Sequence, residues 1–213
     1  MLFVLPWLAA CDADTDTDPR DTAVEVVDPY NGGDPYADAV VSYTPGEGAG
    51  FGQDGFPDIV LGSPQGHAAG APSMHVLSLG KEGVIVLSFD DYTLVDGPGV
   101  DLTVFENPFP GWTEPGFVAV SDDGETWFEW SCDPVAEGQP GCAGVNLVLA
   151  GPDDGTDPTD PTVSGGDQYD LAAIGVSSAR YVRIRDTGTN TYDGDAGGFD
   201  LDAVVVIHGV VGD

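Results

Sequence analysis

Aspartates spaced through glycine-rich loops are the residues of this sequence best suited to chemistry. Short carboxylates in flexible loops are the ordinary ligands of Ca²⁺, which takes about six to eight oxygens and draws several of them from backbone carbonyls. Residues 193–202 alternate carboxylates with glycine and then enter an apolar run. We expect Ca²⁺ to bind there through Asp193, Asp195, Asp200 and Asp202. The alternative is a set of Asp-Gly turns, which need no metal.

Two further loops are candidates for the same chemistry. The first runs from Asp96 to Asp101 around a Gly-x-Gly-x-Asp core, with Glu106 behind it. The second places Asp167 and Asp170 after a pair of glycines. Glu106 shares one face of its expected strand with apolar residues, and a carboxylate in that setting needs a partner cation or strong hydrogen-bond donors. Ca²⁺ is therefore the cofactor that we expect.

Aromatic residues in turns indicate a ligand-binding face. Trp112 ends a Pro- and Gly-rich turn, and it is expected to stack on a sugar ring together with Tyr92, Tyr192 or Tyr169, because the apolar face of a pyranose packs on indole or phenol. The alternative is that Phe109 and Trp112 cap the end of the fold. An extracellular glycan is the expected partner, with another surface protein as the alternative.

Catalytic constellations are weak in this chain. The three histidines, His67, His75 and His208, have no metal-ligand spacing, and no Gly-x-Ser-x-Gly motif accompanies them. With 37 acids, some pair of carboxylates suited to glycoside hydrolysis is inevitable and therefore uninformative. We expect a binding protein and not an enzyme, with a hydrolase as the weakest alternative.

Charge excludes one class of partner. The 37 acids face only 5 bases, giving a formal charge of −32, and such a field repels nucleic acid, whose binding depends on Lys and Arg neutralising phosphates. Three of the five bases, Arg180, Arg183 and Arg185, fall in one expected strand. Arg183 and Arg185 share a face with Tyr181, which indicates an outward face that pairs with acids; contact with an anionic ligand is the alternative.

Short apolar runs between Gly, Pro and Asp clusters indicate the fold class. Most are rich in Val, Ile and aromatic residues, and none keeps an apolar period of 3.6 residues. This spacing predicts an all-β fold, an antiparallel β-sandwich or jelly roll, with one short helical turn near residues 171–174. The expected strands are residues 39–43, 59–61, 75–79, 84–89, 102–105, 117–120, 126–130, 145–149, 181–184 and 201–207.

The last of these runs is apolar on both faces, which predicts a central strand. Simple alternation places Leu201 with Ala203 and Val205 on one face, and Asp200 with Val204 on the other. Trp127 and Trp130 fall on opposite faces of another expected strand, so at most one of those two belongs to the core.

The beginning of the sequence carries an export signature. Leu8-Ala9-Ala10-Cys11 resembles the lipobox of bacterial lipoproteins, in which the preceding segment is removed and the cysteine carries lipid. No basic residue precedes the apolar run, as a secretory signal normally has. The stretch is too short to span a bilayer. The alternative to lipidation at Cys11 is a frayed apolar terminus with a buried cysteine.

These features divide the chain into three parts. Residues 1–11 are the expected lipoprotein signal and lipobox, and residues 12–34 are an expected disordered acidic tether, because they have too few apolar side chains to offset the entropy of ordering. Residues 35–213 are the expected β-sandwich binding domain. The protein is predicted to be exported and lipid-anchored to the bacterial envelope, at the outer membrane or cell surface, and to touch the membrane only through that anchor.

Two cysteines remain in the body of the chain. Cys132 and Cys142 flank a Pro- and Gly-rich segment, where a disulfide would stabilise one loop by roughly 2–3 kcal/mol. Their spacing is not that of a CxxC metal or redox motif. Two unpaired buried thiols are the alternative, less favoured in an exported chain.

Three stretches resemble a known family. Residues 118–127, Val-Ala-Val-Ser-Asp-Asp-Gly-Glu-Thr-Trp, look like a hairpin of discoidin-like, galactose-binding-like domains, and residues 179–184, Ala-Arg-Tyr-Val-Arg-Ile, are similar to a strand of that superfamily. Residues 96–108 and 198–203 resemble bacterial cell-surface lipoproteins that carry such a domain. The resemblance implies a β-sandwich that often holds a structural Ca²⁺ at its rim, near the last strand. It leaves the ligand open, because the superfamily binds carbohydrate, lipid and protein alike.

These features together favour a surface-anchored, calcium-stabilised module that binds carbohydrate. A structural or adhesive lipoprotein that binds other proteins is the alternative.

Overall fold

The computed structural model describes residues 33–65, 73–107, 112–152, 155–190 and 197–211. The lipobox with Cys11, nearly all of the expected tether, Phe109, and the loop carrying Tyr192, Asp193 and Asp195 lie outside these ranges. No helix within them is long and apolar enough to span a membrane.

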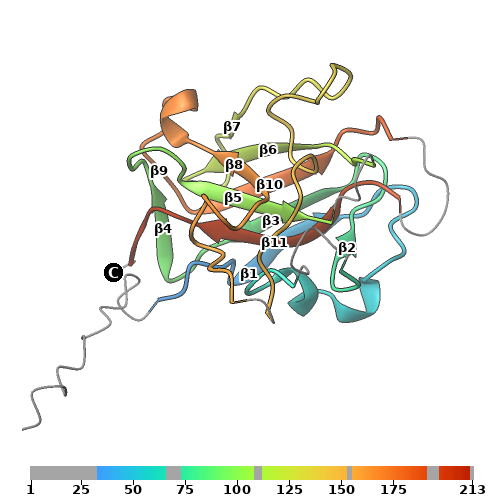
Figure 1. The fold of residues 1–213 in the computed structure, drawn as a ribbon, viewed down its shortest axis with the longest axis horizontal. Coiled ribbons are helices and arrows are strands. Elements are labelled where there is room, and N and C mark those ends of the chain that lie inside the picture. The colour runs from blue at the N-terminus through green and yellow to red at the C-terminus, as the bar shows by residue number, and fades with distance from the viewer. Residues whose placement is uncertain (1–32, 66–72, 108–111, 153–154, 191–196, 212–213) are drawn as a thin grey trace, which may run out of the picture.

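The protein is an all-β sandwich of antiparallel sheets, as the sequence predicts (Figure 1). One layer is a five-stranded sheet in the order β1-β3-β10-β6-β7. Its strands are β1 (Ala39–Thr44), β3 (Val84–Ser88), β10 (Tyr181–Asp186), β6 (Gly116–Ser121) and β7 (Phe128–Glu129).

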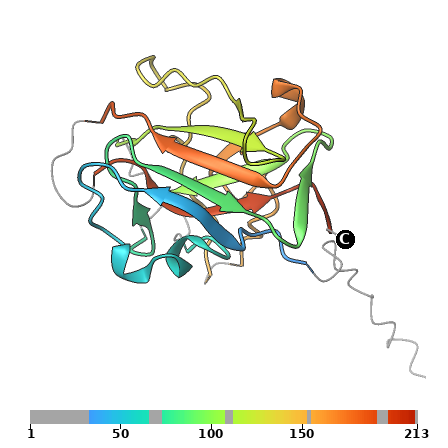
Figure 2. The same cartoon turned by 180° about the vertical axis from the view of Figure 1, so that it is seen from behind.

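The second layer is a four-stranded sheet in the order β2-β11-β5-β8. Its strands are β2 (Leu77–Ser78), β11 (Asp200–Val206), β5 (Leu102–Glu106) and β8 (Asp167–Tyr169). A small third sheet, in the order β12-β4-β9, closes one end of the sandwich and is made of β12 (Gly209–Val211), β4 (Tyr92–Val95) and β9 (Ser178–Ala179) (Figures 1 and 2).

Apolar side chains of both layers meet in one core. Ile85 and Leu87 of β3 pack with Val182 and Ile184 of β10 from one sheet, and Val104 of β5 is among those that meet them from the other. This alternation of inward apolar residues explains why the short Val- and Ile-rich runs form strands.

The central strand β11 is buried on both faces, as predicted, but a bulge changes which residues share a face. Its pairing with β5 shifts register between Leu201 and Ala203, so that Leu201 lies in the main core together with Val204. Ala203 and Val205 face the other way, into a second cluster. Simple alternation was therefore wrong beyond Leu201, because one extra residue in a strand reverses the faces that follow it.

Several expected strands are not strands. Residues 59–61 fall in a 3₁₀ turn, Asp58–Val60, and residues 145–149 contribute only an isolated bridge at Val148. Val148 nevertheless packs in the second cluster, over the outer face of β11 and β5, so its apolar character reflects burial in a loop. The expected helical turn is present as Leu171–Ile174. Alternation did not predict strands β4, β8, β9 and β12, each of which has four residues or fewer.

Candidate metal centre

Three buried carboxylates converge at the end of the sandwich opposite the small third sheet. Glu106 is the last residue of β5, Asp200 is the first of β11, and Glu114 lies two residues before β6 in the other layer. Because β5 and β11 are antiparallel neighbours, the end of one lies beside the start of the other. Glu114 then approaches from the facing sheet, and the three form what we call the acid trio.

The acid trio is buried and closely spaced. Glu106 is 1% exposed, Glu114 7% and Asp200 8%. One carboxylate oxygen from each residue lies within 4.8 Å of the others. Ca²⁺ binds oxygen at about 2.3–2.6 Å, so one ion can bridge oxygens up to about 5 Å apart. The spacing therefore fits a single calcium ion held between three carboxylates.

Few hydrogen bonds compensate this burial. Glu106 Oε1 accepts a 3.3 Å bond from the Asp200 amide, and its Oε2 is buried with no partner among the described residues. Glu114 accepts one bond, 3.0 Å from Asn190 Nδ2, and Asp200 accepts a short bond from Ser78 Oγ. Buried polar oxygens are normally satisfied, so a buried carboxylate oxygen without a partner, on a residue grouped with two other carboxylates, makes this cluster a candidate cation site.

No basic side chain of the described residues supplies that partner. The arginines form their ion pairs elsewhere, Arg180 with Asp122, and Arg183 and Arg185 with Glu129. Burial raises the pKa of Glu114 to about 9, and the charges of Asp200 and Asp186 add to the shift. Burial likewise raises the pKa of Glu106 well above its usual range. The site without a cation thus resists ionisation, which a divalent cation would reverse.

A neighbouring carboxylate has a different role. Asp186, at the end of β10, accepts bonds of 2.8–2.9 Å from the amides of Glu82, Gly188 and Phe199. Its two oxygens are therefore satisfied by backbone donors. Asp186 fixes the loops around the acid trio, and among the described residues the trio's carboxylates have fewer donors than Asp186 has.

The sequence identified two members of the trio but not their grouping. Asp200 and Glu106 were assigned to different loops, and Glu106 does not stand behind the 96–101 loop, because it lies at the other end of β5. Asp202 does not join Asp200 in the trio; it accepts two 3.0 Å bonds from the Gln65 amide. Glu114 was missed, since nothing in a Pro- and Gly-rich stretch marks one acid as buried.

The other predicted ligands form a second cluster at the opposite end. Carboxylate oxygens of Asp96, Asp101 and Asp170 lie within 4.8 Å of one another. Asp101 is buried and accepts bonds of 2.8–2.9 Å from the Gly97 amide, the Leu171 amide and His208 Nδ1, and Asp170 caps the turn Leu171–Ile174. Donors within the protein already account for these two acids, so this cluster is a weaker metal candidate than the trio.

Asp167 stands apart from Asp170, with which it was grouped. It is buried, and it accepts bonds from the amides of Gly144, Val145 and Asn146 and from the Asn146 side chain, at 2.7–3.2 Å. Burial still raises its pKa to about 6. Four donors identify Asp167 as the residue that organises the loop at 144–146.

The proposed ligand-binding aromatics need correction. Tyr92 is 2% exposed and Tyr169 4%, and both lie in the main core, where Tyr169 packs on Trp130 at 4.8 Å between ring centroids. Their ring faces are not available for stacking on a sugar. Trp112 is 48% exposed and remains a candidate. Trp130 is the core tryptophan of its pair, while Trp127 lies outside under Arg183.

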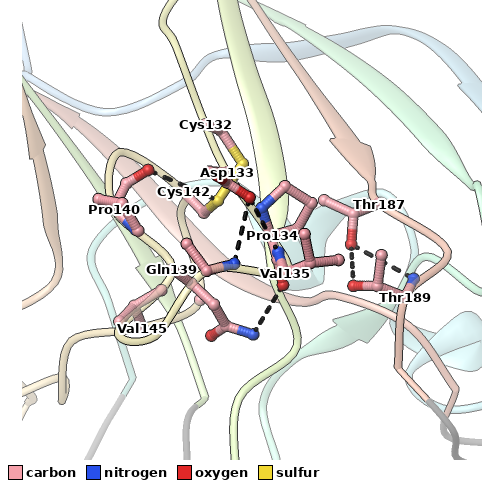
Figure 3. The surroundings of a disulfide bond; sticks show 12 residues. Cys132, Asp133, Pro134, Val135, Gln139, Pro140, Cys142, Val145, Thr187 and Thr189 are labelled. Carbon is pink, nitrogen blue, oxygen red and sulfur yellow. Dashed lines mark hydrogen bonds between the residues drawn. A yellow bond between two sulfur atoms is a disulfide. The ribbon is translucent and has the colours of Figure 1, made fainter.

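A disulfide closes the loop next to Trp112. Cys132 and Cys142 are joined at an S–S distance of 2.07 Å, as the sequence predicts (Figure 3). Across the loop, Gln139 Nε2 donates to the carbonyl of Pro134, and Thr113 Oγ1 donates to Gln139 Oε1 at 2.6 Å. The disulfide loop is thereby tied to the segment that contains Trp112 and Glu114.

The outward arginines pair with acids, as expected. Arg183 and Arg185 both approach Glu129, at 3.6 and 3.8 Å, and stack over Trp127 and Phe117. These contacts account for both side chains within the sheet.

Comparison with known proteins adds no family to these observations. No protein-family model matches the chain, and no curated protein matches it significantly. The function of the chain is therefore inferred from the geometry of its buried carboxylates and exposed side chains.

Proposed function

We propose that this chain is an exported, lipid-anchored binding module whose β-sandwich is stabilised by Ca²⁺ at the acid trio and which binds carbohydrate. One observation carries the calcium proposal: three buried carboxylates, Glu106, Glu114 and Asp200, share a site in which Glu106 Oε2 has no partner among the described residues. Burying such charges is costly unless a cation compensates them.

The donor set selects the type of cation. All three side chains offer hard carboxylate oxygens, which suit Ca²⁺ or Mg²⁺, whereas Zn²⁺ and Cu⁺ sites favour nitrogen and sulfur ligands. Ca²⁺ accepts irregular geometry and more ligands than Mg²⁺, so a site built from two neighbouring strands of one sheet and a loop favours calcium. A disulfide between Cys132 and Cys142 supports an oxidising, extracytoplasmic environment.

Carbohydrate is the ligand that the exposed end of the sandwich fits. Trp112 is 48% exposed, and the next residue, Thr113, donates its hydroxyl to Gln139 Oε1. An aromatic ring next to neutral hydrogen-bonding groups suits a sugar, which has an apolar face and a polar rim. The likeness to galactose-binding-like, jelly-roll domains agrees with a binding module but leaves its ligand class open. The resemblance of residues 8–11 to a lipobox supports attachment to the bacterial envelope.

Calcium-dependent thermal unfolding tests the metal part of the proposal. If Ca²⁺ binds only the folded state at 100 times its Kd, the free energy of unfolding rises by about 2.7 kcal/mol. For a domain of this size each kcal/mol raises Tm by roughly 2–4 °C. We expect this rise relative to chelator in the wild type and its loss in Glu114→Gln. Glu125→Gln, an exposed acid in the 122–126 turn, is the matched control and keeps the full shift.

Retention on immobilised glycans tests the ligand part. Binding that is weakened by Trp112→Ala and retained in Glu125→Gln supports a carbohydrate module. Self-association or protein capture without glycan binding would instead support the structural or adhesive alternative. Absence of a calcium shift in the wild type would overturn the metal proposal whatever the glycan result.

A further inference from the structure

A small hollow lies at the end of the sandwich opposite the acid trio. It has a volume of about 190 Å³ and is lined by Ser88, Phe89, Asp90, Arg180 and Tyr181. The two chain segments that form it are bound to each other, because Ser88 and Tyr181 are paired at the ends of β3 and β10, and the Phe89 amide donates to the Arg180 carbonyl at 3.1 Å. We call it the β3–β10 hollow; Figure 2 shows the two strands side by side.

Its charged groups are held in position by the protein. Asp122 fixes Arg180 twice, through a 3.6 Å ion pair to Nε and a 3.2 Å bond from Nη2 to its carbonyl oxygen. Asp90 accepts a 3.0 Å bond from Ser88 Oγ, and its own amide donates to Asp38 Oδ2 at 2.6 Å. These contacts restrain both head groups at an exposed surface, where the Arg180 side chain is 52% exposed, and they lower the entropy cost of binding modestly.

The lining defines the chemistry of a ligand. A guanidinium donates hydrogen bonds, a carboxylate accepts them, and a phenol ring offers an apolar wall with a polar tip. An anionic ligand is disfavoured because Asp90 and Asp122 flank the arginine in a chain of formal charge −32. A purely apolar ligand would displace water from Asp90 and Arg180 without offering either group a hydrogen bond in exchange. A neutral molecule with several hydroxyl groups fits these conditions.

Size restricts the ligand further. A hollow of about 190 Å³ is smaller than ordinary ligand pockets, which have volumes of about 300–1,000 Å³, so it suits one small unit such as a monosaccharide ring. We infer that the β3–β10 hollow binds a single neutral sugar unit, with Asp90 and Arg180 hydrogen-bonding its hydroxyls and Tyr181 packing on its ring. This inference rests on the proposed carbohydrate function and adds a second place where sugar is bound.

The hollow is separate from the Trp112 region. Tyr181 begins β10 and Asp186 ends it beside the acid trio, and a strand rises about 3.4 Å per residue, so the two ends are roughly 17 Å apart. Changes at the hollow and at Trp112 therefore act on different contacts, and substitutions distinguish the two sites.

The inference is tested by titrating the calcium-loaded protein with glucose, galactose, mannose and fucose in turn. Binding is monitored through the NMR chemical shifts of the backbone amides. We expect at least one sugar to shift the amides of Arg180 and Tyr181, and glucuronate to shift them less. Arg180→Gln and Asp90→Asn should each lower the affinity for that sugar by roughly tenfold or more, since each removes a charge-assisted hydrogen bond. Arg185→Gln removes the same charge from the other end of β10 and should leave the affinity unchanged, while Tm verifies that each variant is folded.

The outcomes separate the hollow from the proposed function. Sugar binding that survives Arg180→Gln and Asp90→Asn but is lost in Trp112→Ala overturns the hollow and leaves the carbohydrate proposal standing. An equal loss in Arg185→Gln also overturns it, because a general charge effect would then explain the data. If the folded wild type binds none of the four sugars while retaining its response to calcium, both the hollow and the carbohydrate proposal fail and the metal site stands.

Discussion

Asp101 immediately precedes β5 and Glu106 ends it, and of these two buried acids only Asp101 has donors to both of its carboxylate oxygens among the described residues. Asp101 accepts from Gly97, Leu171 and His208, while Glu106 Oε2 has no partner among the described residues. Two acids that look alike in the sequence therefore have opposite roles. The donors around Asp101 compensate its burial, whereas Glu106 Oε2 is left without such compensation by the residues that the structure describes.

This contrast predicts opposite effects of neutralising the two acids. Glu106→Gln should raise the stability of the chelator-treated protein by roughly 1 kcal/mol, because the amide can donate to the neighbouring carboxylates, and it should abolish the calcium response. Asp101→Asn should lower stability by roughly 2–3 kcal/mol, because it removes a charged acceptor from buried donors, and it should leave the calcium response intact. Urea unfolding with calcium and with chelator measures both effects.

A particular result would contradict this assignment. If Asp101→Asn abolished the calcium response and Glu106→Gln did not, the metal would bind with Asp96 and Asp170 at the other end of β5. The trio would then be a group of protonated acids with no ion.

The sequence predicted the fold class and most of the longer strands, but it did not predict which residues come together in the acid trio. Short apolar runs rich in Val, Ile and aromatic residues predicted β1, β3, β5, β6, β10 and β11, because such runs between turn residues are typical of buried strands. The trio depends on contacts between the end of β5, the start of β11 and a loop before β6, and such long-range contacts leave no local pattern. No sequence pattern indicates the bulge at Asp202 either, yet the bulge determines which residues of β11 face the main core.

Burial was the property least visible in the sequence. Tyr92 follows Asp90 and Asp91, and Tyr169 follows a Gly-Gly-Asp segment, but β4 and β8 carry both rings into the core. Trp112 sits in a similar stretch and is half exposed. The composition of the surrounding loop did not distinguish the buried rings from the exposed one, because the pairing of short strands determines which rings are buried.

The metal-free protein should lose stability as the pH rises. Burial raises the pKa of Glu114 from 4.5 to about 9, so between these values the folded state holds a proton that the unfolded state releases. Stability from this group is therefore fully present below pH 4.5 and is lost as pH rises through about 9. Calcium should offset the loss, because it replaces the proton at the carboxylate.

Urea midpoints measured across this pH window, with chelator and with calcium, check the sign. Glu114→Gln should flatten the profile in chelator, while Glu125→Gln should not. A chelator profile that rises with pH over the same range would show that Glu114 is ionised in the empty site.

Removal of the disulfide should weaken the fold without removing the metal. Cys132 and Cys142 are 10 residues apart, and a loop of that length restricts the unfolded chain by roughly 2–3 kcal/mol. The double variant Cys132→Ser with Cys142→Ser should lose about this much stability, measured by Tm, and keep its calcium shift. Glycan retention should weaken in parallel if the loop positions Thr113 and Trp112 through Gln139. Loss of the calcium shift would instead place the disulfide loop within the metal site.

Gly144 provides the closest test of how the loop positions Glu114. Its φ is +77°, and a Cβ there would lie 2.3 Å from the Glu114 carbonyl oxygen. Gly124 has a similar φ of +74°, but its Cβ would meet nothing nearer than the Tyr181 ring at 3.7 Å. Gly124→Ala should therefore lower the free energy of unfolding only by the backbone strain, roughly 1–2 kcal/mol. Gly144→Ala should cost that plus roughly 1–3 kcal/mol for displacing the Glu114 segment.

The two alanine variants should also differ in their response to calcium. Displacement of Glu114 moves one of the three carboxylates out of the range that a single ion bridges, so Gly144→Ala should bind Ca²⁺ more weakly and show a smaller Tm shift, whereas Gly124→Ala should keep the wild-type shift. Calorimetric titration of both folded variants measures the difference. Equal calcium affinities, with Gly144→Ala the less stable protein, would show that Glu114 packs at this end of the sandwich without contributing to the ion.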